Sequence, residues 1–245
     1  MLPLYDDNPT RTKPYVTWTL VALNVLVYLL QVTTTQWSPY GARGPLAGWM
    51  LVPAELTQGL RAPTNGLDGP PAFLTLFTCM FLHGGLLHLL GNMLFLIIFG
   101  NNIEDALGRV KYIFFYLLCG LAAGLTQVMA NPASTVPIVG ASGAIAGVLG
   151  AYMLLYPKAR VNTLVFLVVF ITRVAVPAWL LLSFWILSQF FNQFTHALGG
   201  GEDKGGVAYL AHIGGFLAGM LLIKVFGAKG HSPEPSYQVR YPDEG

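Results

Sequence analysis

The chain has 245 residues, of which 54% are hydrophobic and only 10% are charged, and its formal net charge is +2. Soluble domains carry about 25% charged residues, so this composition excludes an ordinary soluble protein and predicts a multi-pass membrane protein. So small a net charge gives no reason to expect a nucleic-acid partner.

The chain begins with a short polar segment, residues 1–14, which lacks the basic, apolar and cleavage regions of a signal peptide. About 20 apolar residues suffice to cross the hydrocarbon core of a bilayer. Residues 15–227 are therefore predicted to form one all-α domain of six transmembrane helices. The predicted helices are centred near Val25, Phe95, Leu118, Leu149, Leu182 and Phe216.

Two further stretches are not expected to span the membrane. Residues Leu164 to Ile171 are apolar but too short to cross, so we predict an extended or surface-lying connection there. Residues 228–245 are polar and rich in proline, which is typical of a disordered cytoplasmic tail. Cys79 and Cys119 both lie in apolar runs and are interpreted as small buried hydrophobic residues.

The basic residues predict the orientation, because Lys and Arg near the ends of spans favour the cytoplasmic side. With a cytoplasmic N-terminus, ten of the 13 Lys and Arg residues lie on that side. These are Arg11, Lys13, Arg109, Lys111, Lys158, Arg160, Arg173, Lys224, Lys229 and Arg240. Both termini are then cytoplasmic, and the uncharged turn over residues 131–140 lies outside.

The second predicted helix carries a polar cluster of His83, His88 and Asn92. Ionisable groups at membrane depth are costly and usually mark function. His88 and Asn92 are four residues apart and share a face, so they could donate hydrogen bonds to an oxyanion. A zinc site is the rival interpretation, but no H-E-x-x-H motif is present, and we predict no metal and no cofactor. His83 lies on another face, where a structural role is favoured.

Ser142 follows the external turn, in the sequence Gly140-Ala141-Ser142-Gly143. It is expected in the first turn of the fourth helix, where unpaired backbone N–H groups can stabilise negative charge. A serine in this position could also simply cap the helix. Capping alone does not account for the neighbouring glycines.

Small residues recur every four positions in two of the predicted helices. Gly143, Gly147 and Ala151 do so in the fourth helix, and Ala211, Gly215 and Gly219 in the sixth. Such faces allow two helices to approach backbone to backbone, which would bring His212 within hydrogen-bonding distance of Ser142. The same spacing is equally compatible with helix packing alone, in which His212 is an ordinary core histidine.

Together these residues resemble the motifs of the rhomboid family of intramembrane serine proteases. Gly140-Ala141-Ser142-Gly143 resembles the nucleophile turn G-x-S-G, and His83, His88 and Asn92 resemble H-x4-H-x3-N of the second helix. Residues 211–216 resemble the sixth helix with its catalytic base, and residues 102–108 the junction between the second and third helices. The resemblance covers the membrane core from about Phe73 to Phe226.

The resemblance implies a catalytic dyad, in which Ser142 is the nucleophile and His212 the general base and acid. It also implies an oxyanion hole made by Asn92, His88 and the backbone N–H of Ser142, with His83, Gly140, Gly143 and Gly215 in supporting positions. The implied partners are transmembrane protein substrates and the lipid bilayer. The implied location is the cell membrane, with the active site open to the external side.

Two positions depart from the family pattern. Leu74-Thr75 stands where many members have Trp-Arg, and Ala146 stands where some have a tyrosine that stacks on the catalytic histidine. Two alternatives to a protease are kept. The chain could be a catalytically silent rhomboid-like protein that binds membrane clients, although it retains both Ser142 and His212. A small transporter is also compatible with six spans, although no inverted repeat supports it.

Overall fold

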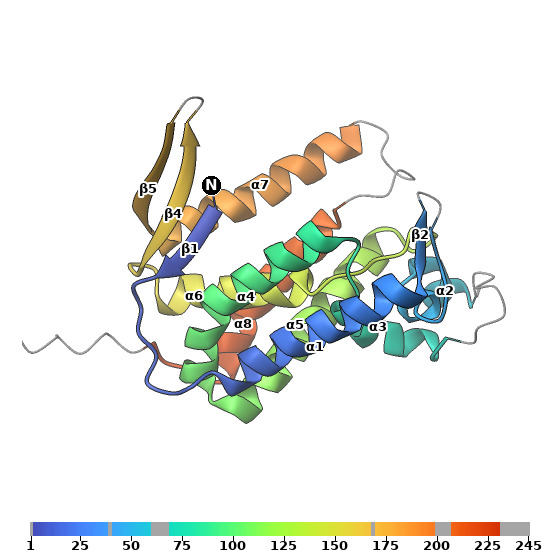
Figure 1. Ribbon diagram of the computed structural model, residues 1–245, viewed down its shortest axis with the longest axis horizontal. Helices are drawn as coiled ribbons and strands as arrows, with labels where there is room; N and C mark the ends of the chain where they lie inside the picture. The colour runs from blue at the N-terminus through green and yellow to red at the C-terminus, as the bar shows by residue number, and fades with distance from the viewer. Residues whose placement is uncertain (1, 39–40, 60–68, 168–169, 199–206, 231–245) are drawn as a thin grey trace, which may run out of the picture.

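A computed structural model describes residues 2–38, 41–59, 69–167, 170–198 and 207–230. Most of them are helical, and the long helices lie side by side (Figure 1). Each of the six predicted apolar centres lies in one of these helices: α1 (Tyr15–Thr34), α4 (Leu86–Leu107), α5 (Arg109–Ala130), α6 (Ser142–Leu155), α7 (Ala178–Leu198) and α8 (Tyr209–Val225). Within the described residues, α1, α4 and α5 are long and apolar enough to cross a membrane.

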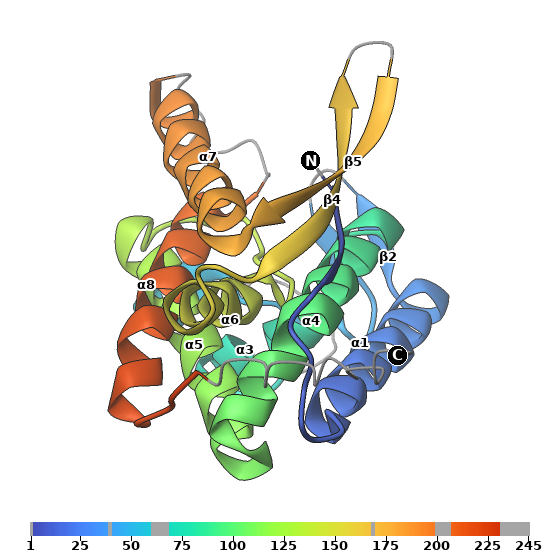
Figure 2. The same ribbon diagram turned by 90° about the vertical axis from the view of Figure 1, so that its left-hand side faces the viewer.

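Helix α6 lies at the centre of the bundle, in contact with α4, α5, α7 and α8 (Figure 2). All its residues from Gly143 to Tyr152 are buried, as expected for a helix that is apolar on every side. The small faces of α6 and α8 meet as the spacing predicts. A Cβ atom on Gly215 would collide with the carbonyl group of Gly143, and one on Gly219 with the backbone of Gly147.

The all-α prediction is wrong outside the helical bundle. β1 (Leu2–Asp6), β4 (Arg160–Leu167) and β5 (Phe170–Pro177) form an antiparallel sheet in the order β1-β4-β5. Valine and threonine are frequent in β4 and β5 and favour strands. The predicted extended connection is thus a β-hairpin, whose residues 168 and 169 lie outside the described part. The polar N-terminal segment supplies the third strand, with Leu2 opposite Leu164.

Shorter elements fill the connection between α1 and α4, at the opposite end of the bundle from β1 (Figure 1). They are β2 (Gln36–Ser38), β3 (Gly41–Arg43), η1 (Ala47–Trp49), α2 (Pro53–Gln58), η2 (Ala72–Leu74), α3 (Thr75–Thr78) and η3 (Cys79–Phe81). A backbone bridge between Leu51 and Ile138 joins this connection to the turn before α6. Cys79 and Cys119 are free and buried, as predicted. Of the predicted tail, only residues 228–230 lie among those described.

Carboxylates at the end of α4 anchor the start of α1. Glu104 accepts hydrogen bonds from the backbone N–H groups of Val16, at 3.0 Å, and Thr17, at 2.8 Å, and from the Thr17 hydroxyl at 2.8 Å. These amides belong to the first turn of α1, where a helix leaves its N–H groups unpaired and favours negative charge. The next residue, Asp105, binds Arg11 and Thr12. This end of α4 is therefore fixed to the N-terminal segment.

Candidate active site

Ser142 and His212 lie side by side where α6 and α8 begin. Ser142 is the first residue of α6, and His212 lies in the first turn of α8. The Ser142 Oγ atom is 2.7 Å from Nε2 of His212. No side-chain capping bond is present at the start of α6, where Ala141 is the N-cap residue. The Ser142 hydroxyl is thus directed at the imidazole, and the close approach of Gly143 and Gly215 explains the short distance.

The imidazole of His212 has a second polar neighbour, which the sequence reasoning did not identify. Its Nδ1 atom lies 2.8 Å from Oε1 of Gln189 in α7. The indole of Trp185, one turn earlier in α7, lies with its centroid 5.7 Å from that of the imidazole and is tilted by 36°. The only available signal was a glutamine four residues after a tryptophan in an apolar helix. Ala146 is fully buried and offers no ring to His212.

His88 and Asn92 extend from α4 toward the turn that precedes α6. The backbone N–H of Gly84 donates to Nδ1 of His88 at 3.4 Å, so the hydrogen of a neutral ring is on Nε2. Within the described part of the chain, Nδ2 of Asn92 has no hydrogen-bonding partner. Both residues line the same cavity as Ser142. Two potential donors therefore line the cavity that contains the serine.

Gly140 makes room for these donors. Its backbone φ angle is +123°, a value that residues with a side chain rarely adopt. A Cβ atom at this position would lie 2.8 Å from Nε2 of His88 and 3.6 Å from Nδ2 of Asn92. Its N–H donates to the carbonyl of Cys79 at 2.9 Å, which holds the turn against η3. Any other residue at position 140 would displace His88.

The structure does not bring His83 to Ser142. Its side chain is fully buried, and its ring lies edge-on against that of His88, with centroids 5.2 Å apart. The side chain of Gln31 in α1 binds the backbone of His83, accepting from its N–H at 3.0 Å and donating to its carbonyl at 2.6 Å. His83 therefore packs behind His88, consistent with a structural role.

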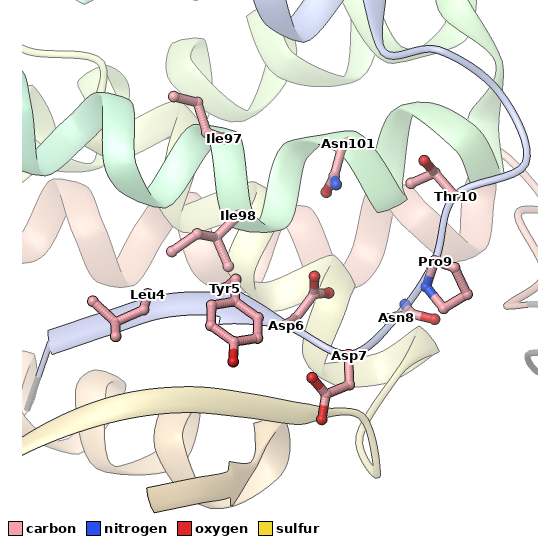
Figure 3. Close-up of a pocket in the computed structure, with 10 residues that line it drawn as sticks. All are labelled: Leu4, Tyr5, Asp6, Asp7, Asn8, Pro9, Thr10, Ile97, Ile98 and Asn101. Carbon is pink, nitrogen blue, oxygen red and sulfur yellow. The ribbon is translucent and has the colours of Figure 1, made fainter. Parts of the chain in front are cut away.

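A cavity of about 1150 Å³ connects these groups. Ser142, His212, His88, Asn92 and Trp185 all line it, together with the turn before α6. A second pocket, of about 660 Å³, lies between the N-terminal segment and the middle of α4 and contains none of these residues (Figure 3). The described residues include no group of three His, Cys, Asp or Glu side chains that could hold a metal ion.

The arrangement supplies the three requirements of acyl transfer. A serine hydroxyl is a weak nucleophile and needs a base within hydrogen-bonding distance. The tetrahedral intermediate needs donors directed at its oxyanion, and the substrate needs access. Ser142, His212, the donors on α4 and the cavity correspond to these requirements.

Comparisons with known proteins point to one family. A family model described as Rhomboid domain matches residues 70–229, which is more than half of the chain. "Rhomboid protein 1, mitochondrial" of Saccharomyces cerevisiae is 32% identical over 145 residues, or 58% of this chain and 38% of that protein. "Rhomboid-like protease 5" of Toxoplasma gondii is 33% identical over 142 residues, or 58% of this chain and 15% of that protein.

A third relative is more similar over a shorter region. "RHOMBOID-like protein 1" of Arabidopsis thaliana is 42% identical over 78 residues, which is 32% of this chain and 20% of that protein. The matched regions thus make up less than half of each of these three relatives.

Proposed function

Because the chain belongs to the rhomboid family, we propose that it is an intramembrane serine endopeptidase that hydrolyses peptide bonds in or near transmembrane segments of other membrane proteins. The observation that carries the proposal is the 2.7 Å distance between Ser142 Oγ and His212 Nε2 at the wall of an open cavity. One of the relatives is itself named a protease.

The reaction begins when Ser142 Oγ attacks the scissile carbonyl carbon and His212 Nε2 takes the hydroxyl proton. The resulting tetrahedral intermediate collapses as the C–N bond breaks, and His212 gives its proton to the leaving amine. Water then attacks the acyl-enzyme with His212 again acting as base, which releases the new carboxyl group and restores Ser142. The cavity supplies the water that the hydrocarbon core lacks.

The oxyanion of the intermediate is stabilised by donors from two helices. Asn92 contributes its free Nδ2, and His88 its Nε2–H, because Gly84 occupies the other ring nitrogen. The backbone N–H of Ser142 lies in the first turn of α6, where it has no acceptor within the helix. Each such donor contributes to catalysis most strongly where water is excluded.

The chain is a multi-pass membrane protein, and we propose the following arrangement for it. The six helices that contain the predicted apolar centres lie across the cell membrane, both termini are cytoplasmic, and the cavity opens to the external side. Ala133 in the turn before α6 and Lys229 after α8 are both exposed, whereas the native cysteines are buried. On intact cells, an impermeant maleimide is expected to label Ala133→Cys and not Lys229→Cys; the reverse pattern would contradict this orientation.

The test of the activity is labelling of the detergent-purified protein with a fluorophosphonate, which reacts with activated serines. We expect labelling of the wild type and none of Ser142→Ala or His212→Ala. Cleavage of a transmembrane substrate in liposomes should show the same dependence. Cleavage that persists in pure Ser142→Ala would exclude the dyad. A folded wild type that neither labels nor cleaves would favour the client-binding alternative.

A further inference from the structure

Both ring nitrogens of His212 take part in hydrogen bonds, and a residue of α7 is the partner of Nδ1. We propose that Gln189 is a positioning residue, which holds His212 in the tautomer that can accept the proton of Ser142. This inference rests on the proposed protease function and adds a third member to the pair of residues on α6 and α8.

The hydrogen bonds of Gln189 determine which end of its amide faces His212. Its Nε2 group donates to the backbone carbonyl of Trp185 at 3.2 Å and to Oγ of Ser188 at 3.0 Å. Its Oε1 is the atom 2.8 Å from Nδ1 of His212. Rotating the amide by half a turn would place Oε1 against the carbonyl oxygen of Trp185, where neither atom can donate. The amide oxygen therefore faces the imidazole.

An oxygen at this position requires a hydrogen on Nδ1. A neutral imidazole carries only one hydrogen, so Nε2 is left with a lone pair directed at the Ser142 hydroxyl. The opposite tautomer would place a hydrogen on Nε2 and could not take the serine proton. When His212 becomes an imidazolium after proton transfer, Nδ1 keeps its hydrogen and Gln189 still accepts it. The same bond thus serves the resting site and the protonated base.

The burial of both residues strengthens the hydrogen bond between Gln189 and His212. Gln189 and His212 have relative exposures of only 7% and 9%, and a hydrogen bond at such a site is stronger than one in water. Gln189 is the one polar residue among the buried positions of α7, whereas the exposed positions from Trp179 to Phe194 carry large apolar side chains. The contact with His212 explains why a glutamine occupies this buried position. A buried amide would not otherwise stabilise a helix that faces the membrane.

Trp185 restricts the same ring in a second way. Its indole lies against His212 and also against Phe216, with centroids 6.2 Å apart in the latter pair. Trp185 and Gln189 are one helical turn apart, so they approach the imidazole from the same face of α7. The orientation of the base therefore depends on the docking of α7 onto α8.

The test replaces Gln189 in two ways and uses Asn192→Leu, a half-buried position on the same helix, as the control. Gln189→Leu keeps the volume but removes the acceptor. We expect its kcat to fall about 10- to 100-fold, as when an orienting partner of a histidine is removed, with KM unchanged. Gln189→Glu restores an acceptor and adds a charge that favours the imidazolium. The pH below which cleavage is lost should then rise by about one to three units.

A purely structural role for Gln189 would not move the pH profile. If Gln189→Leu cleaves like Asn192→Leu and the profile of Gln189→Glu is that of the wild type, the inference is overturned while the protease assignment stands. If Gln189→Leu does not fold, the profile of Gln189→Glu decides. The ¹⁵N resonances of His212, identified by their loss in His212→Ala, give a readout independent of activity. They should show a hydrogen on Nδ1 in the wild type; a hydrogen on Nε2 would overturn the inference even if no substrate were cleaved.

Discussion

Helix α4 carries polar side chains at both ends, and the two sets are bonded in opposite ways. Near its start, Nδ2 of Asn92 has no hydrogen-bonding partner among the described residues, and Nε2 of His88 lies close to Gly140 in the lining of the cavity. Near its end, Glu104 accepts three hydrogen bonds from α1, and Asp105 accepts three from Arg11 and Thr12. The start of α4 thus offers hydrogen-bond donors to a ligand, whereas the carboxylates at its end already accept hydrogen bonds from the protein.

The two ends of α4 therefore contribute to different properties, the start to reactivity and the end to stability. Buried polar groups in native proteins are usually bonded, and an unsatisfied one calls for an explanation. At the end of α4 the bonds fix α1 and the N-terminal segment to the bundle. At its start His88 and Asn92 line the cavity that a substrate can enter. Changes at the start of α4 should therefore alter the rate of cleavage, and changes at its end should alter the stability of the fold.

The largest expected effect is the loss of a spare donor. Asn92→Ala should lower kcat about 10²- to 10³-fold, the usual cost of removing one oxyanion donor. Its melting temperature should stay close to that of the wild type, because the Asn92 side chain has no hydrogen bond to the described residues that the substitution could break. Both quantities can be measured on one purified sample. A large loss of stability with unchanged kcat would contradict the comparison at the start of α4.

The matching change at the end of α4 is Glu104→Ala. It leaves three donors at the start of α1 without their acceptor. Unsatisfied buried donors cost about 1 to 3 kcal/mol each, and water can reach some of them, so we expect a loss of about 3 kcal/mol. Thermal unfolding followed by circular dichroism measures it. The kcat of the protein that remains folded should stay near the wild-type value; a hundredfold fall would show that the two ends are coupled.

Gly219→Ala should lower both the stability of the fold and kcat, because this position lies between the two ends of the bundle. A Cβ atom there collides with the backbone of Gly147, so α6 and α8 must separate. Overpacking of this kind costs about 1 to 3 kcal/mol, and the separation should also weaken the Ser142–His212 contact and lower kcat. The stability control is Gly91→Ala in α4, where the added atom meets open space. Equal melting temperatures for the two variants would contradict the close approach of α6 and α8.

The family resemblance implied the pairing of Ser142 with His212, whereas local patterns in the sequence predicted the helices and the small faces of α6 and α8. Each depends on spacing within one helix, which a single sequence displays. The sheet was missed because β1 pairs with β4, more than 150 residues away in the chain. Gln189 and Trp185 were missed for a similar reason. Nothing within α7 indicates which helix faces them, and that depends on how α7 docks on α8.

The smallest expected effect concerns Asp6, at the same end as Glu104. Its carboxylate accepts a hydrogen bond from the hydroxyl of Tyr152 in α6. Burial raises the pKa of Asp6 from 3.8 to about 6, against the smaller opposing effect of that bond. Because the folded pKa lies above the unfolded one, the native state binds more protons between these values. The contribution of Asp6 to stability is thus complete at low pH and is lost as the pH rises through about 6.

Asp6→Asn removes this titration and keeps an oxygen for Tyr152. The variant should match the wild type at about pH 4 and exceed its stability at about pH 7 by about 1 to 2 kcal/mol, after allowance for solvent screening. Melting temperatures of both proteins across this range give the difference directly. If the melting temperatures of Asp6→Asn and the wild type change in parallel with pH, the carboxylate of Asp6 is as well satisfied by hydrogen bonds as that of Glu104. Among the described residues, this end of the bundle would then contain no strained carboxylate, and its contrast with the start of α4 would be sharper.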